Sequence, residues 1–291
     1  MIDTPQRGWL THARQRAQRV WRVVRSPALA YKSFRVSQSM GVSEAPHIFV
    51  LGIPRAGTTL LASILAAHTG VSAFRLETHF FLQRNYQYLR IPGVDPADIR
   101  SMVLTSTSRV DLYDRLARRM VGDAPAPQRV LEKTPGHARL LPELLTGFPN
   151  AQFVFLIREP RDAYASLQGG VKLPRFTPAQ YADFWNRLTD RAASAPTDRV
   201  HMVRYEDMVC DPVACLQAVC SFLGLDYQPD MLSPDVHAQH SPEYSSRGDH
   251  KRLGKAITPS SIGKWKQVLP EDVAALLHAG CRTNAVQFGY D

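Results

Sequence analysis

The sequence predicts an α/β fold built in three layers, with a central, mainly parallel sheet between two layers of helices. Short apolar runs rich in β-branched and aromatic residues alternate along the chain with longer stretches of helical periodicity. Strands that alternate with helices in this way pair in parallel. The composition, 44% hydrophobic and 21% charged over 291 residues, is that of an ordinary globular protein and excludes disordered, collagen-like and coiled-coil chains.

The first 45 residues form a basic amino-terminal arm ahead of a single domain at 46–291. Residues 1–40 contain eight Lys and Arg residues against Asp3 alone, a net +7 out of +9 for the whole chain. Apolar residues recur at three- and four-residue steps from Leu10 to Val24, which predicts an amphipathic helix ending near Ser26 and Pro27. Residues 7–35 either contact an anionic membrane surface or pack as a solvated helix on the domain. No nucleic acid is expected as a partner, because no aromatic, basic platform for single strands follows the arm.

Within 46–291, buried strands and helices are expected in alternation. The strands are expected at 47–51, 129–131, 152–157 and 200–203. The helices are expected at 58–67, 98–120, 137–145, 161–167, 178–193, 212–223 and 271–281. Residues 224–262 are rich in Pro, Ser, His and charge with little periodicity, and an irregular segment of this length is a functional lid or disordered.

A glycine-containing turn between the first strand and the first helix has the pattern of a phosphate-binding loop, GIPRAGTT at 52–59. Gly52 and Gly57 let the backbone approach a ligand, and the N–H groups at the helix start, with the positive end of the helix dipole, face an anion. The pattern departs from the P-loop GxxxxGK[ST] because Thr58 takes the place of the lysine and Arg55 carries the charge. A plain strand-to-helix turn would explain the glycines but not Arg55. The fold class is therefore refined to P-loop NTPase-like.

A second anion site follows the strand at 152–157. The segment REPRDAYAS at 158–166 puts Arg158 at the carboxyl end of a strand, where doubly wound sheets bind ligands, and Ser166 on the next helix. A guanidinium group suits a phosphate, although Arg158 could instead pair with Glu159 or Asp162 as an ordinary ion pair. Anion sites at two strand ends suit a nucleotide that carries both 5′ and 3′ phosphates.

In these segments the chain resembles the sulfotransferases that use 3′-phosphoadenosine 5′-phosphosulfate. PRAGTT at 54–59 is similar to that family's 5′-phosphosulfate loop, and the segment 158–166 is similar to its 3′-phosphate site. VRYED at 203–207 and IGKW at 262–265 are similar to further family segments. The resemblance runs from residue 46 to residue 266, and its specificity lies in the order of the four pieces.

Two more segments place the resemblance nearest the tyrosylprotein and related bacterial sulfotransferases, namely LETHF at 76–80 and LEKTP at 131–135. The resemblance implies that Glu77 is the general base for an acceptor hydroxyl and that Lys133 stabilises charge on the transferring sulfonate. It also implies a donor-binding set: Arg55, Ala56, Gly57, Thr58 and Thr59 for the 5′-phosphosulfate, Arg158 and Ser166 for the 3′-phosphate, and Tyr205 and Lys264 to complete the site.

The sequence departs from the tyrosylprotein branch at two positions. His79 stands where those enzymes have an arginine, and Gly170 replaces another arginine after the serine of their 3′-phosphate site. Binding of a peptide tyrosine is therefore not supported. Cytosolic aryl sulfotransferases use a histidine as base, so His79 and His137 are alternatives to Glu77.

The expected function is transfer of a sulfonate from 3′-phosphoadenosine 5′-phosphosulfate to a hydroxyl of a small metabolite, glycan or lipid. No metal is expected, because fixed cations suffice for a sulfonate and no predicted strand ends in the aspartate with which P-loop enzymes hold magnesium. The alternatives are a P-loop kinase or nucleotide hydrolase, and a non-catalytic nucleotide-binding membrane adaptor.

With no signal peptide, no spanning segment and only four cysteines, the chain is expected in the cytoplasm or peripheral to the inner face of the membrane. The sequence sets neither the acceptor nor the oligomeric state.

Overall fold

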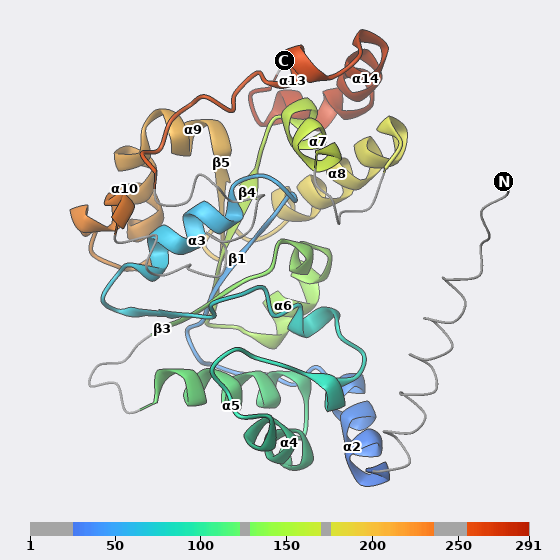
Figure 1. The fold of residues 1–291 in the computed structure, drawn as a ribbon, viewed down its shortest axis with the longest axis vertical. Helices are drawn as coiled ribbons and strands as arrows, with labels where there is room; N and C mark the ends of the chain where they lie inside the picture. The colour runs from blue at the N-terminus through green and yellow to red at the C-terminus, as the bar shows by residue number, and fades with distance from the viewer. Residues whose placement is uncertain (1–25, 123–128, 170–175, 236–254, 291) are drawn as a thin grey trace, which may run out of the picture.

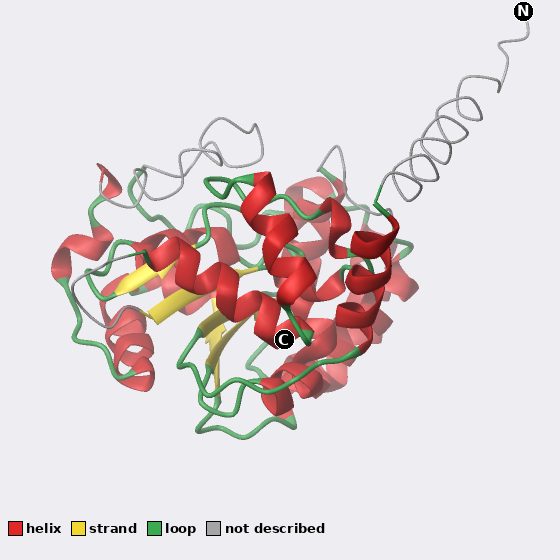
Figure 2. Cartoon of the chain, turned by 90° about the horizontal axis from the view of Figure 1, so that it is seen from below, coloured by secondary structure: helices red, strands yellow, loops and turns green. Residues whose placement is uncertain are grey.

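A five-stranded parallel sheet in the order β2-β3-β1-β4-β5 forms the centre of the protein, with helices on both sides (Figure 1, Figure 2). The structure, a computed structural model, describes residues 26–122, 129–169, 176–235 and 255–290. The strands are β1 (Ile48–Gly52), β2 (Val71–Ala73), β3 (Arg129–Lys133), β4 (Gln152–Ile157) and β5 (Val200–Arg204). The expected α/β fold with a parallel sheet is confirmed. The three-residue edge strand β2 was not predicted, since it is too short to show a period.

The register of the sheet brings the carboxyl ends of four strands to one edge. β1 lies between β3 and β4, with Val50 opposite Lys133 and Gly52 opposite Leu156. β4 pairs in turn with β5, where Ile157 is opposite Arg204. The segments that follow these strands carry most of the residues singled out in the sequence, so the topology gathers them at this edge.

The helices agree with the predicted ones in most places. They are α2 (Pro27–Gln38), α3 (Thr58–Ala66), α4 (Pro96–Thr105), α5 (Arg109–Val121), α6 (Leu141–Gly147), α7 (Pro160–Gln168), α8 (Pro178–Ala193), α9 (Tyr205–Cys210), α10 (Pro212–Leu223), α13 (Trp265–Val268) and α14 (Glu271–Gln287). The described residues also form short 3₁₀ helices, namely η1 (Phe80–Leu82), η2 (Tyr86–Tyr88), η3 (Pro135–Leu140) and η4 (Pro229–Leu232).

Three of the predicted helices were wrong in their extent, and one of them, expected at 271–281, continues to Gln287 as α14. The helix expected at 98–120 is broken between α4 and α5, where Ser106 Oγ donates to the carbonyl of Met102 (2.7 Å) and Ser108 Oγ caps α5 by accepting from Asp111 N (3.1 Å). Hydroxyl side chains that bond the local backbone in this way end a helix and begin another. The helix expected at 137–145 is a 3₁₀ turn followed by α6, and α2, α9 and α13 were not predicted at all.

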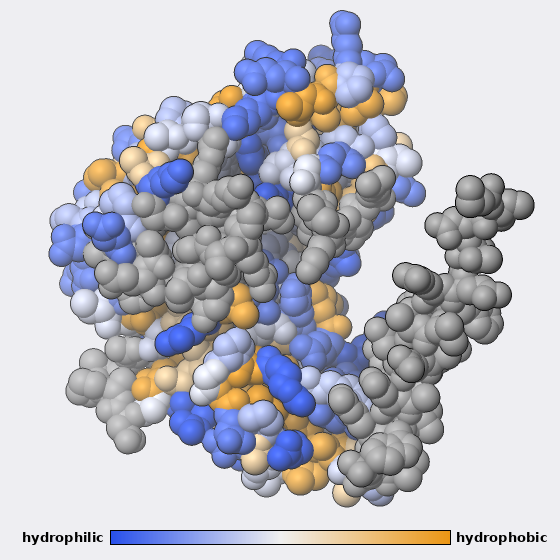
Figure 3. Space-filling view, in the orientation of Figure 1, coloured by the Kyte–Doolittle hydropathy of each residue, from blue (hydrophilic) through white to orange (hydrophobic). Residues whose placement is uncertain are grey.

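Helix α2 packs on α4, α5 and η2, and its Leu29 and Val36 are buried in the core. The amphipathic helix expected ahead of Ser26 lies outside the described residues, as does the stretch 236–254 of the expected lid. Within the described ranges, no helix has both the length and the apolar character needed to cross a bilayer. Hydrophobic and hydrophilic residues are interspersed over the face of the described surface that Figure 3 shows.

Candidate functional site

The glycine loop turns the chain sharply from β1 into α3. Gly52 has a φ of 144°, and a Cβ there would lie 2.2 Å from the carbonyl oxygen of Leu156, so only glycine lets β1 pass β4 this closely. Gly57, with a φ of 87°, occupies the N-cap position of α3, where no side chain caps the first turn. The first N–H groups of α3 therefore have no side-chain acceptor, which is the arrangement that binds an anion. Thr58 and Thr59 are buried in this first turn.

Arg55 directly joins the two motifs that the sequence predicts to bind anions. Its backbone adopts a φ of 71°, which is uncommon for a residue with a side chain. From this position Arg55 Nε donates to Ser166 Oγ of α7 at 3.1 Å, and the Arg55 carbonyl accepts from Arg158 Nη1 at 3.1 Å. Two segments more than 100 residues apart thus form one continuous cradle.

The Arg158 guanidinium is the buried centre of this cradle, and only 6% of the residue is exposed. Its Nη2 donates to the carbonyl of Ser261 at 2.6 Å, and its plane lies over the ring of Tyr205, 4.3 Å from the centroid. Its Nε is buried and has no hydrogen-bond partner among the described residues. A buried cationic donor without an acceptor is costly, so this atom fits an anionic group supplied by a ligand.

The ordinary ion pairs that the sequence allowed for Arg158 do not form. Glu159 pairs instead with Arg161, and burial is the main factor that raises the pKa of Glu159 above its usual value, although Arg161 opposes it. Asp162 is buried and accepts from the backbone N–H groups of Gly263 (2.7 Å) and Trp265 (2.9 Å). Asp162 therefore holds the segment whose Ser261 carbonyl contacts Arg158, although nothing in the sequence beyond its place in the first turn of a helix marked it.

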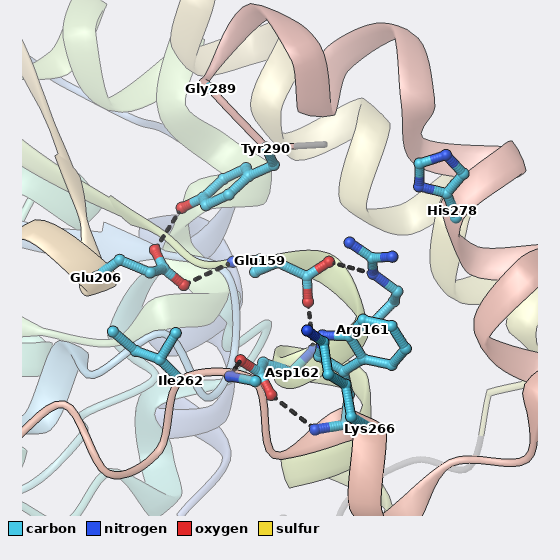
Figure 4. A pocket seen from close by; sticks show the side chains of 11 residues that line it. Glu159, Arg161, Asp162, Glu206, Ile262, Lys266, His278, Gly289 and Tyr290 are labelled. Atoms are coloured by element: carbon cyan, nitrogen blue, oxygen red, sulfur yellow. Dashed lines mark hydrogen bonds and ion pairs between the residues drawn. The ribbon is translucent and has the colours of Figure 1, made fainter.

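A hollow of about 590 Å³ lies beside this segment, between α7, the start of α9, α13 and the end of α14 (Figure 4). In its wall, the Glu206 carboxylate accepts from Glu159 N (3.1 Å) and from the Tyr290 hydroxyl (2.7 Å). None of the site residues predicted from the sequence lines this hollow. Its polar groups brace the turn that leads from Arg158 into α7.

Lys133 connects the glycine loop to the predicted base. Its Nζ donates to Thr59 Oγ1 of α3 at 3.1 Å and to Glu77 Oε1 at 2.7 Å. The Lys133 side chain is 4% exposed, whereas that of Glu77 is 30% exposed and can be reached from outside. His79 lies on the other side of the carboxylate, with Nε2 3.5 Å from Glu77 Oε2, and its backbone φ is 49°.

His137, one alternative base, is enclosed in the protein. Its Nδ1 lies 3.0 Å from Glu132 Oε2, and its Nε2 accepts from Phe81 N at 3.2 Å. Burial by itself raises the pKa of Glu132, but His137 and the hydroxyls of Thr134 and Thr78 lower it below its usual value. With both ring nitrogens engaged and no exposed surface, His137 has a structural role. Glu132 and Lys133 do not pair with each other, because successive strand residues point to opposite faces.

The structure thus brings together most of the residues predicted from the sequence. Those gathered at the carboxyl edge of the sheet are Arg55, Ala56, Gly57, Thr58, Thr59, Glu77, Lys133, Arg158, Ser166 and Tyr205. Lys264 is exposed, and it lies in the segment that Asp162 holds. Gly170 lies outside the described residues. In the described part of the chain, no group of three or more His, Cys, Asp or Glu residues is placed to hold a metal ion.

Comparisons with known proteins agree with this geometry. The profile of the "Sulfotransferase family" matches residues 46–229, and that of the "Sulfotransferase domain" matches residues 175–289. A protein-tyrosine sulfotransferase of Drosophila melanogaster is 25% identical over 258 residues, which cover 79% of this chain and 49% of that protein. The nodulation protein NoeE of Sinorhizobium fredii is 26% identical over 289 residues, covering 87% of this chain and 68% of that protein. The chain therefore spans about half the length of the first relative and about two thirds of the second.

The fold also matches a solved structure. The sulfotransferase domain from the Synechococcus PCC 7002 olefin synthase superposes with a TM-score of 0.63 at 23% sequence identity, covering 86% of this chain and 96% of that domain. At this identity the match shows the shared fold.

Proposed function

The chain belongs to the sulfotransferase family, and on that premise we propose that it moves a sulfonate from 3′-phosphoadenosine 5′-phosphosulfate to a hydroxyl of a small metabolite, glycan or lipid. The donor supplies an activated sulfonate and leaves as adenosine 3′,5′-bisphosphate. One observation carries the proposal. Lys133 Nζ contacts both Thr59 Oγ1 in the first turn of the anion-binding helix and Glu77 Oε1. A single buried cation thus lies between the place for a charged donor and the group that can take an acceptor's proton.

The residues of the cradle fit a donor with charge at two positions. The start of α3 and Arg55 would hold the phosphosulfate end, and Lys133 would stabilise charge that develops during transfer. Arg158, with its unpaired Nε, and Ser166 would hold the 3′-phosphate. The ring of Tyr205 packs against the Arg158 guanidinium, and Lys264, which is exposed, would complete the donor site. We propose no metal ion for this site.

Glu77 is the base that this geometry favours. Its carboxylate is half-buried, held on one side by Lys133 and flanked on the other by His79. A group held in place before the reaction contributes more than one that must be oriented during it. His79 is more exposed than Glu77, and its Nε2 lies 3.5 Å from the Glu77 carboxylate, so we propose that it acts beside the base rather than as the base. The presence of histidine where the tyrosylprotein enzymes have arginine favours an acceptor other than a peptide tyrosine.

A transfer assay tests this function. Full-length protein would be incubated with donor carrying ³⁵S-sulfonate and a panel of phenols, steroids, carbohydrates and lipids, without added magnesium. We expect label on at least one acceptor class and release of adenosine 3′,5′-bisphosphate. Hydrolysis of ATP that requires magnesium would instead show the kinase or hydrolase alternative. Tight binding of adenosine 3′,5′-bisphosphate with no label on any acceptor would show the non-catalytic adaptor.

Gly57→Ala is expected to weaken nucleotide binding through a steric contact. A Cβ at this position would lie 2.8 Å from Tyr205 Cδ2 and 3.0 Å from Met208 Cε, so the ring under Arg158 must shift. Gly93 is a matched control, because its φ of 82° is close to the 87° of Gly57 and a Cβ there meets nothing within 4 Å. Both variants should lose about 1–2 kcal/mol of unfolding free energy from the left-handed backbone. Only Gly57→Ala should lower the affinity for adenosine 3′,5′-bisphosphate in calorimetric titration, and equal affinities would contradict the predicted contact.

A further inference from the structure

Glu132 is a buried charged residue that takes no part in the donor cradle. It lies in β3 next to Lys133, and its side chain has no exposed surface. Burial raises the pKa of Glu132, but His137 and two hydroxyl groups bring that pKa below its usual value. A buried charge is costly unless well-placed partners satisfy it. The carboxylate thus depends on its partners, and these surround the predicted base.

The partners of Glu132 lie on both sides of the loop that carries Glu77. Glu132 Oε1 accepts from Thr78 Oγ1 at 2.8 Å and from Thr134 Oγ1 at 2.6 Å. Glu132 Oε2 lies 3.0 Å from His137 Nδ1. Thr78 directly follows Glu77 in the sequence, whereas Thr134 and His137 follow β3. One carboxylate therefore joins the loop after β2 to the segment after β3.

Three consecutive backbone N–H groups of this loop donate to the same partners. The bonds run from His79 N to Thr134 Oγ1 (3.2 Å), from Phe80 N to Thr78 Oγ1 (3.1 Å) and from Phe81 N to His137 Nε2 (3.2 Å). Each of the three acceptor side chains is itself bonded to Glu132. The backbone from residue 79 to residue 81 is thus tied to one buried carboxylate through a single side chain at each position.

The directions of these bonds require a carboxylate at position 132. Because His137 Nε2 accepts from Phe81 N, the ring proton is on Nδ1, which donates to Glu132. A carboxylate accepts from all of its donors, whereas the amide of Glu132→Gln presents N–H groups to some of them. An amide N–H that faces His137 opposes the ring proton, and one that faces the threonines leaves their hydroxyl protons without an acceptor.

Lys133 bonds the same loop from the other face of β3. Successive strand residues point to opposite faces, and Lys133 Nζ donates to Glu77 Oε1 at 2.7 Å. The neighbouring loop residues Glu77 and Thr78 are therefore bonded by the neighbouring strand residues Lys133 and Glu132. Residues 74–79 belong to no helix or strand, so these side-chain bonds replace regular backbone pairing in holding the loop.

We propose that Glu132 is a positioning residue for Glu77, a role that rests on the proposed function of Glu77 as the base. Through its three partners Glu132 fixes the backbone at 78–81, and this backbone sets where the Glu77 carboxylate lies relative to an acceptor hydroxyl. A misplacement of about 1 Å can lower a rate about 100-fold. Donor binding does not depend on this placement, because the donor cradle is built from the glycine loop and residues 158–166.

Thr78→Val and Thr78→Ser are the pair of variants that tests the proposal. Valine has the shape of threonine but lacks the hydroxyl, so Thr78→Val removes the bonds to Glu132 Oε1 and from Phe80 N, whereas Thr78→Ser keeps both. We expect Thr78→Val to lower kcat about tenfold without changing the affinity for adenosine 3′,5′-bisphosphate. Thr78→Ser should keep most of kcat. Glu132→Gln should lower kcat about as much as Thr78→Val, and the half-buried position of Thr78 makes its variants independent of folding in the core.

Amide hydrogen exchange measures the position of the loop without the reaction. Exchange at 78–82 should be faster in Thr78→Val, because Phe80 N loses its acceptor, and unaltered in Thr78→Ser. Thr189→Val is the matched control, since its buried hydroxyl donates to the Trp185 carbonyl (3.0 Å) and accepts from Asn284 Nδ2 (3.0 Å) where α8 packs on α14. It should lower stability and leave both kcat and the exchange at 78–82 unchanged.

Two outcomes would overturn the proposal: unaltered exchange at 78–82 in Thr78→Val, or faster exchange there with unchanged kcat. A fall in nucleotide affinity that equals the fall in kcat would also overturn it, because the effect would then be on the whole site. If the unaltered protein transfers no sulfonate while exchange changes as expected, the function of Glu77 fails and the tie between Glu132 and the loop stands. Failure of the positioning role and failure of the proposed chemistry are therefore separate results.

Discussion

Replacing Glu77 by Gln is expected to lower kcat for sulfonate transfer by about 10²–10⁴-fold, the usual contribution of a general base. Glutamine keeps the shape of the side chain and an oxygen that Lys133 Nζ can contact, but it cannot take the proton of an acceptor hydroxyl. Affinity for adenosine 3′,5′-bisphosphate should stay nearly unchanged, because the donor cradle is built from other residues. Single-turnover kinetics and calorimetric titration of the same preparation would measure the two quantities.

Two controls separate loss of the general base from a general effect of the Glu77→Gln substitution. Glu143→Gln makes the same change at an exposed position of α6 and should leave kcat unaltered. Thermal unfolding must also be compared, because removing the carboxylate leaves the buried Lys133 without its ion pair, and a buried charge that loses its partner destabilises a protein. Full turnover in Glu77→Gln would show that Glu77 is not the base. If Glu77→Gln keeps full turnover and His79→Gln loses it, His79 is the general base.

Replacing Arg158 by Ala is expected to remove the preference for a 3′-phosphate. Affinity for adenosine 3′,5′-bisphosphate should fall about 10- to 100-fold, because a charge-assisted hydrogen bond contributes roughly 1.5–3 kcal/mol. Affinity for adenosine 5′-phosphate should fall far less. The ratio of the two constants is the readout, since a general weakening of the site would lower both.

Arg129 is the matched control for Arg158. It is also a partly buried arginine whose guanidinium donates to backbone carbonyls, among them those of Pro46 (2.7 Å) and Leu223, but it lies at the start of β3. Arg129→Ala should lower stability and leave the nucleotide ratio unchanged. Equal affinities of the unaltered protein for the two nucleotides would contradict the assignment of Arg158 to the 3′-phosphate. An unchanged ratio of the two affinities in Arg158→Ala would contradict it as well.

Local sequence was enough to predict the features that depend on near neighbours. The strands β1 and β4 are continuous apolar runs, and α8 has both a strong period and a capping box at Thr177 and Gln180. The glycine loop was recognisable because a tight turn into a helix requires Gly52 and Gly57 at fixed spacing. β2 and the break at Ser106 to Ser108 were missed, because a three-residue strand has no period and hydroxyl side chains are compatible with either a helix interior or a cap.

The amino-acid sequence by itself determined the class of fold, the glycine loop between the first strand and the first helix, and the chemical type of each residue in the cradle. Only the tertiary structure decided which of them meet: Arg55 with Ser166, Lys133 with Thr59 and Glu77, and Arg158 with carbonyl groups rather than with carboxylates. The physical reason is that these contacts join segments 56 to 111 residues apart, and the parallel register of the sheet sets which side chains lie within hydrogen-bonding distance. No local pattern encodes that distance.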